Sequence, residues 1–137
     1  MKNNIRLILV AFLVAVFVLQ PSSIAQASGG TYKCEFVKQT PADYTVFAPK
    51  AQFDMYWTLK NTGTATWTGI QLVFVSGRAI NTYPAPFALT STTPPGQRLK
   101  VGVDMMAPKL PGTYVTNWGL AKNGVVFCRF YLILTVR

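Results

Sequence analysis

After residue 28, apolar and polar residues alternate with a period of two, and this feature constrains the fold more than any other. Successive side chains of a β-strand point to opposite faces of its sheet, so such alternation predicts half-buried strands. Stretches with helical spacing of apolar residues are not found there. Short strands in this number predict an all-β, immunoglobulin-like antiparallel β-sandwich of about seven strands. The alternating runs cover residues 32–36, 53–59, 70–74, 99–105, 114–120 and 126–136.

Turn-forming residues separate these runs. Asn123-Gly124 stands between the last two, and both residues tolerate the positive φ angles of a type I′ hairpin turn. The stretch 77–96 is rich in proline and threonine and alternates poorly. We expect it to be a long connection between the sheets, or to contain one short edge strand near residues 87–90.

Residues 1–27 are expected to be a secretory signal peptide that precedes the fold. Lys2 and Arg6 come before an uncharged apolar run over residues 7–19, and Ala25-Gln26-Ala27 places small residues at the cleavage positions. Cleavage before Ser28 would leave one Ig-like domain over residues 28–137, secreted or associated with the cell surface. The apolar run of about 13 residues is shorter than the roughly 20 needed to cross a bilayer, so no transmembrane span is expected after cleavage. An uncleaved membrane anchor is the alternative.

The chain has two cysteines, Cys34 and Cys128. An exported protein meets an oxidising environment, in which a pair of cysteines forms a disulfide by default. Both cysteines fall on the apolar side of their alternating runs. We therefore expect a disulfide that joins the first strand to the last.

The composition argues against an enzyme. The chain has no histidine and only four acidic residues, so no catalytic, cofactor-binding or metal-binding residues are predicted. Without Lys2 and Arg6, 11 basic residues face 4 acidic ones, a net charge of +7. Such a positive field attracts anionic polymers, lipid headgroups and acidic proteins. The charges are scattered and carry no nucleic-acid-binding motif, so specific nucleic-acid binding is not expected.

A set of aromatic and glycine residues over 53–136 has a recognisable spacing. It reads FDMYWTLKNTGTATW (53–67), APKLPGTYVTNWGL (107–120), KNGVVF (122–127) and FYLILTV (130–136). This pattern resembles the four-tryptophan Ig-like domain, the central domain of the Next to BRCA-one autophagy receptor, which also occurs in bacterial secreted proteins. Trp57, Trp67 and Trp118 match three of the tryptophans, Tyr131 stands where the fourth is expected, and Cys128 where the family often has glycine. The resemblance implies an Ig-like sandwich and a non-catalytic module that engages proteins.

Side-chain parity separates expected core residues from candidate binding residues. Trp57 and Trp118 face inward, and Tyr114 is expected to bond a nearby backbone group as a corner tyrosine, so all three are predicted to be structural. Trp67 either caps the end of the sandwich or lies partly exposed in a ligand groove. Aromatic residues and arginine dominate interface energetics, although ordinary surface positions are the alternative reading. The candidate ligand-binding residues are Tyr56, Trp67, Arg78, Tyr83, Phe87, Arg129 and Tyr131.

These observations predict a secreted, non-enzymatic recognition or adhesion module that binds a protein or an anionic surface polymer. A carbohydrate-binding module is one alternative, with Trp67, Tyr83 or Phe87 as stacking platforms. A structural subunit of an extracellular assembly, built by pairing of sheet edges, is another. We expect no cofactor, and a monomer or weak oligomer.

Overall fold

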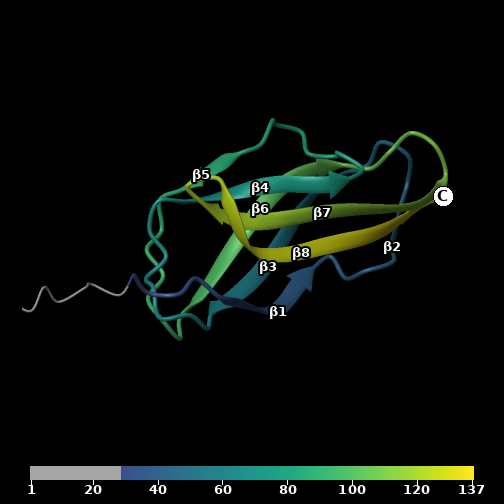
Figure 1. Cartoon of the computed structure of the whole chain (residues 1–137). Coiled ribbons are helices and arrows are strands. Elements are labelled where there is room, and N and C mark those ends of the chain that lie inside the picture. Colours follow the sequence, from purple (N-terminus) through teal and green to yellow (C-terminus); the bar gives the residue numbers. More distant parts are fainter. Residues whose placement is uncertain (1–28) are drawn as a thin grey trace, which may run out of the picture.

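The computed structural model describes residues 29–137, which form two β-sheets packed face to face (Figure 1). The three-stranded sheet has the order β1 (Cys34–Thr40), β3 (Gln52–Asn61) and β6 (Arg98–Met106). The five-stranded sheet has the order β2 (Thr45–Phe47), β8 (Val125–Val136), β7 (Gly112–Lys122), β4 (Ile70–Gly77) and β5 (Phe87–Leu89). The predicted immunoglobulin-like sandwich is confirmed, whereas the signal peptide lies outside the described residues.

Residues 29–137 form eight strands where about seven were expected. The additional strand is β2, whose three residues are too few for alternation to reveal. Unlike the other pairs, β2 runs parallel to its neighbour β8. Within residues 29–137, no helix is long and apolar enough to cross a membrane.

The core lies between the inward faces of the two sheets. Trp57 and Trp118 are both fully buried there, with ring centroids 6.1 Å apart. Their polar atoms are satisfied: the Trp57 Nε1 donates to the Tyr131 carbonyl over 3.1 Å, and the Trp118 Nε1 to the Thr116 Oγ1 over 2.9 Å. Both residues therefore add a large buried ring without leaving an indole N–H unpaired.

Local turn chemistry agrees with the sequence at three places. Asn123 and Gly124 have φ angles of 49° and 79° and join β7 to β8, as a type I′ turn requires. The Tyr114 hydroxyl donates to the Leu110 carbonyl over 2.8 Å, which confirms the corner tyrosine. The 77–96 connection runs beside β6, where Asn81 bridges Met105, and then forms the edge strand β5.

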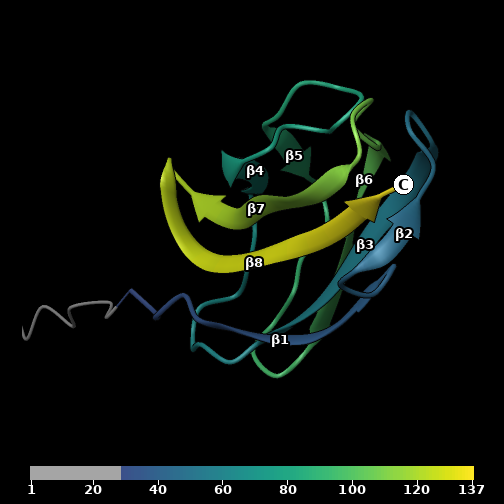
Figure 2. The same ribbon diagram turned by 90° about the vertical axis from the view of Figure 1, so that its right-hand side faces the viewer.

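The chain changes sheets near its beginning, and this leaves one side of the sandwich open. β1 pairs with β3, then residues 41–44 cross to the other sheet, where β2 lies beside the end of β8 (Figure 2). β2 reaches back along β8 only as far as Leu134. Between the Cys34–Cys128 disulfide and this crossing, β1 and β8 face each other from different sheets without pairing.

Candidate recognition surface at the open side of the sandwich

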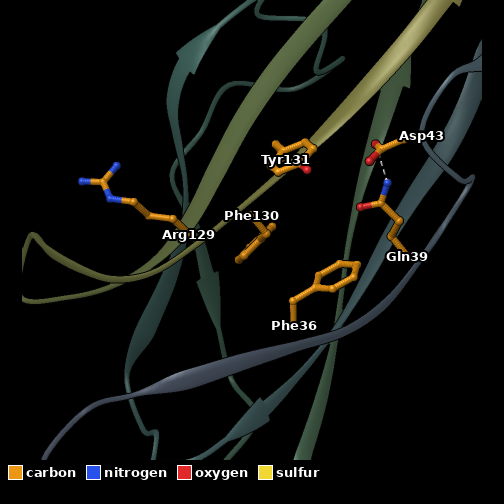
Figure 3. Close-up of a pocket in the computed structure, with 6 residues that line it drawn as sticks. All are labelled: Phe36, Gln39, Asp43, Arg129, Phe130 and Tyr131. Atoms are coloured by element: carbon orange, nitrogen blue, oxygen red, sulfur yellow. Dashed lines mark hydrogen bonds between the residues drawn. The ribbon is translucent and has the colours of Figure 1, made fainter.

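A hollow of about 220 Å³ opens between β1 and β8, and we call it the side hollow. Its lining comes from β1, the crossing segment and β8: Phe36, Gln39, Asp43, Arg129, Phe130 and Tyr131 (Figure 3). Pockets for small organic ligands measure roughly 300–1,000 Å³. The side hollow is smaller, so its size suits one side chain of a partner rather than a whole small molecule.

The aromatic lining of the side hollow comes from opposite sheets. Phe36 stands opposite Leu59 of β3 and so keeps the inward parity expected from the sequence, yet 48% of it is exposed. The exposure arises because β8 does not cover this part of β1. Phe130, at 5% exposure, lies deeper, and Tyr131 of β8 is also 48% exposed.

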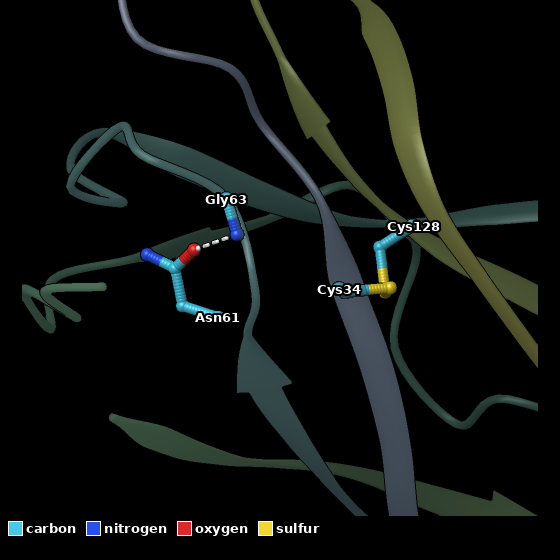
Figure 4. The surroundings of a disulfide bond; sticks show 4 residues. All are labelled: Cys34, Asn61, Gly63 and Cys128. Carbon is cyan, nitrogen blue, oxygen red and sulfur yellow. Dashed lines mark hydrogen bonds between the residues drawn. A yellow bond between two sulfur atoms is a disulfide. The ribbon is translucent and has the colours of Figure 1, made fainter. Parts of the chain in front are cut away.

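Beyond one end of the side hollow, just before Phe36 and Arg129 in sequence, lies the disulfide between Cys34 and Cys128, which confirms the predicted pairing (Figure 4). The bond joins β1 to β8 with a Cα–Cα distance of 5.6 Å. The other end is closed by Asp43, whose Oδ1 accepts hydrogen bonds from the Gln39 Nε2 over 2.8 Å and the Ile133 backbone N–H over 2.9 Å. Both ends of the opening are therefore fixed by specific bonds.

The backbone of β8 presents an unpaired edge along the side hollow. The Ile133 carbonyl accepts from the Tyr44 N–H, and the Tyr131 carbonyl accepts from the Trp57 indole, so both residues direct their backbone groups away from β7. Hydrogen-bonding direction repeats every second residue in an antiparallel pair. The N–H of Tyr131 and the N–H and carbonyl of Arg129 therefore also point to this side. β2 ends short of them.

Arg129 and Tyr131 stand between two depressions. One is the side hollow, and the other lies on the outer face of the five-stranded sheet against Val75, Ser76 and Asn117. The Arg129 side chain points away from Phe36 and Phe130 (Figure 3). A chain lying along this edge would thus contact an apolar hollow on one face and a guanidinium group on the other.

Two other predicted candidates lie on separate surfaces. Tyr56 stands on the outer face of the three-stranded sheet, where the Lys100 Nζ lies 3.9 Å from its ring centroid. Tyr83 is 61% exposed and lines a shallow depression with Asp54 and Asp104.

Arg78 and Phe87 also lie apart from the side hollow. Arg78 lines a depression that includes Lys50 and Lys109. Phe87 is half-buried, with its ring stacked on Trp118 at 6.2 Å. Of the seven candidates, the structure therefore brings only Arg129 and Tyr131 into one site.

The prediction that Trp67 is partly exposed in a ligand groove is wrong. Its side chain is fully buried and packs against Phe127, with ring centroids 5.4 Å apart. Trp67 also exchanges two backbone hydrogen bonds with Thr93. The alternative, that Trp67 caps the end of the sandwich, is the one the structure supports.

Sequence reasoning missed Phe36, Gln39 and Asp43 as site residues. Phe36 was expected to face the core, because alternation shows which face of a strand a side chain lies on. It does not show whether another strand covers that face. The signal that β1 ends here was Pro41, which lacks the N–H that a continuing ladder needs.

Within residues 29–137, no three acidic or cysteine side chains gather in a metal-binding arrangement. The side hollow offers apolar contact, backbone hydrogen bonding, the positive charge of Arg129, and the Asp43 carboxylate, which already accepts two hydrogen bonds.

Comparison with known proteins agrees with this architecture. Residues 40–136 match the family described as the Ig-like domain from next to BRCA1 gene. The chain is similar to the Protein NBR1 homolog of Arabidopsis thaliana, with 37% identity over 84 residues, which covers 59% of this chain and 12% of that protein. It is also similar to the mouse Next to BRCA1 gene 1 protein, with 31% identity over 99 residues, which covers 71% of this chain and 10% of that protein.

The chain thus spans about a tenth of the length of the curated relatives it matches. Among solved structures, it resembles the CARDB domain of a Pyrococcus furiosus protein, with a TM-score of 0.52 and 13% identity over 79% of this chain and 95% of that one. At this identity the likeness shows the fold alone. Because the family match extends over most of the sequence, the chain belongs to the family of Ig-like domains from next to BRCA1 gene.

Proposed function

We propose that this protein is a secreted, non-catalytic recognition module that binds an extended segment of a protein partner along the exposed edge of β8. The observation that carries the proposal is that the Tyr131 N–H and the Arg129 N–H and carbonyl have no neighbouring strand and lie directly beside an apolar hollow. Exposed strand edges are templates for pairing with another chain, and natural proteins usually cover them. The chain belongs to an Ig-like family, and it has few acidic residues and no histidine. Both facts agree with binding rather than catalysis.

The geometry specifies how such a segment would bind. A partner strand would extend the five-stranded sheet by hydrogen-bonding to the backbone of Arg129 and Tyr131. Alternate side chains of a strand face opposite sides, so one partner residue would enter the side hollow against Phe36 and Phe130. Its neighbour would meet the Arg129 guanidinium, which favours a carboxylate. The preferred partner sequence therefore alternates an apolar residue with an acidic one.

The alternative of a carbohydrate-binding module depended on sugar stacking by Trp67, Tyr83 or Phe87, and most of that support is lost. Trp67 is buried and Phe87 is stacked on Trp118, so only Tyr83 of the three keeps an exposed ring. Two copies of this chain could pair with each other through the same exposed edge of β8 that we assign to a protein partner. Light scattering after size-exclusion chromatography separates the two: a monomer at micromolar concentration supports a foreign partner.

The decisive experiment compares partner binding by two variants. Arg129→Ala/Tyr131→Ala removes both exposed side chains at the β8 edge, and Tyr83→Ala removes an even more exposed tyrosine ring elsewhere. Partners captured from extracellular extract by the oxidised mature chain should be lost with the first variant and kept with the second. Peptides from those partners should crosslink to β8 or β1. Equal capture by all three proteins, or crosslinks confined to other surfaces, would refute the proposal.

Export is a separate part of the proposal with its own measurement. The signal peptide expected over residues 1–27 predicts that the secreted protein begins at Ser28. N-terminal sequencing of protein from the culture medium checks this. Recovery only in the cell pellet with Met1 intact would contradict it.

A further inference from the structure

We infer that the outer face of the three-stranded sheet is a second binding surface, for an acidic polysaccharide whose repeating units carry carboxylates. The surface is defined by Lys38 of β1, Lys60 of β3, and Arg98 and Lys100 of β6, and we call it the cationic face. It adjoins the side hollow at Gln39 of β1, but none of its four cations lines the edge proposed for a protein partner.

Strand register brings these four side chains together although they are far apart in sequence. Thr58 lies between Lys38 and Lys100 in one cross-strand row, and Lys60 pairs with Arg98 in the next row on this face. The irregularity between Phe36 and Lys38 shifts β1 by one residue and turns Lys38 outward. Neighbouring strands lie 4.7–4.9 Å apart, so the Cα atoms of Lys38 and Lys100 are about 10 Å apart.

Three acidic residues share the outer face of this sheet with the four cations, but they are unevenly placed. Glu35, opposite Lys60, is the acidic residue on this half of the sheet. The other two acidic residues of these strands, Asp54 and Asp104, stand opposite each other on β3 and β6, nearer the far end of the sheet. The cationic face therefore attracts a carboxylate polymer, with a strength that salt weakens.

Neutral polar groups lie among the charges. A depression of about 360 Å³ is lined by Lys38, Gln39, Thr40, Tyr56, Thr58 and Lys100. Hydroxyl and amide groups of this kind pair with sugar hydroxyls, while the ammonium groups pair with carboxylates. Tyr56 supports the arrangement, because its ring receives the Lys100 Nζ at 3.9 Å.

Gly102 makes room for this ring. It is the cross-strand partner of Tyr56, and a Cβ at Gly102 would lie 2.6 Å from the Tyr56 Cε1. The absence of a side chain there lets the tyrosine lie close to the sheet beside the two lysines.

The chemistry of the cationic face favours a polysaccharide over other polyanions. Single-stranded nucleic acids are held by several aromatic stacking platforms, whereas this face offers one ring that already contacts Lys100. Protein interfaces are built around apolar anchors, whereas Thr58 stands between Lys38 and Lys100, and the one aromatic ring in these rows, Tyr56, is already covered by Lys100. A flat surface of ammonium, guanidinium, hydroxyl and amide groups matches a chain of uronate sugars.

The test measures binding of the oxidised mature protein to polygalacturonate, with neutral dextran as the control polymer. Arg98→Glu/Lys100→Glu should weaken binding to polygalacturonate by about tenfold or more, because four units of charge change on the surface. Arg78→Glu/Lys109→Glu makes the same change in net charge beside the opposite end of β6 and should leave most of the affinity. Circular dichroism checks that both variants fold.

Three results would overturn the inference. The first is no binding to polygalacturonate at low salt, and the second is an equal loss of affinity in both charge-reversal variants. The third is equal or tighter binding of duplex DNA or anionic lipid vesicles, which would mark general attraction to polyanions. Arg129→Ala/Tyr131→Ala should keep polygalacturonate affinity, so this surface and the β8 edge succeed or fail separately.

Discussion

Replacing Cys34 and Cys128 together by alanine should lower the free energy of unfolding by about 4–5 kcal/mol. The disulfide joins residues 94 positions apart, and the chain-entropy relation gives about 4.7 kcal/mol at 25 °C for a loop of that size. Alanine is preferred to serine because Cys128 is only 2% exposed, and a buried hydroxyl without a partner would add a cost of its own. The total stability of a domain is typically about 5–15 kcal/mol, so this bond is a large share of it.

Guanidinium unfolding followed by tryptophan fluorescence measures this effect, since Trp57, Trp67 and Trp118 are all fully buried. With an m-value of about 4 kcal/mol/M, the midpoint should fall by roughly 1 M. Wild-type protein unfolded in the presence of a reductant should show a similar midpoint, which separates loss of the crosslink from loss of packing. A shift below about 0.3 M in both experiments would refute the entropic argument.

Substitutions at three further positions test single side chains, with unfolding midpoints as the common measurement. Asn61→Asp should cost about 3–5 kcal/mol, because the fully buried amide donates to two backbone carbonyls that a carboxylate cannot serve. Tyr114→Phe should cost only about 1 kcal/mol, since its bond to Leu110 is exposed and water replaces it. Asp43→Ala should cost about 1–3 kcal/mol by leaving the Ile133 N–H without its acceptor, and Asp43→Asn should recover most of the loss. An equal cost for Asn61→Asp and Tyr114→Phe would contradict the role given to burial.

Much of the fold could be predicted because its signals are local. Alternation placed Met55, Trp57 and Leu59 on one buried face, and the structure buries all three. The Asn123-Gly124 turn followed from the φ angles that those residues tolerate. The disulfide followed from parity together with a count of two cysteines. The first two inferences need only residues that are close together in the chain. The third needs no more, because two cysteines can pair in only one way.

The candidate site was harder to predict because it depends on where strands stop. Arg129 and Tyr131 were singled out from their outward parity, but nothing in their own run indicated that β2 pairs only with the end of β8. Phe36 illustrates the same limit. Its inward parity was correct, and its exposure arises because β1 and β8 belong to different sheets and β8 does not cover it.

Trp67 shows the limit from the other direction. It follows a turn and lies outside the alternating runs, so the sequence left its exposure open, and the structure buries it against Phe127.

The class of fold, the inward set of side chains and the covalent link between the first and last strands all follow from the order of residues in the chain. Only the tertiary structure decided that β1 and β2 belong to different sheets, and that Lys38, Lys60, Arg98 and Lys100 share one face. The physical reason is that the side-chain period of a strand is local, whereas the partner of a strand edge is chosen among segments far apart in the chain. Both proposed binding surfaces arise from that choice.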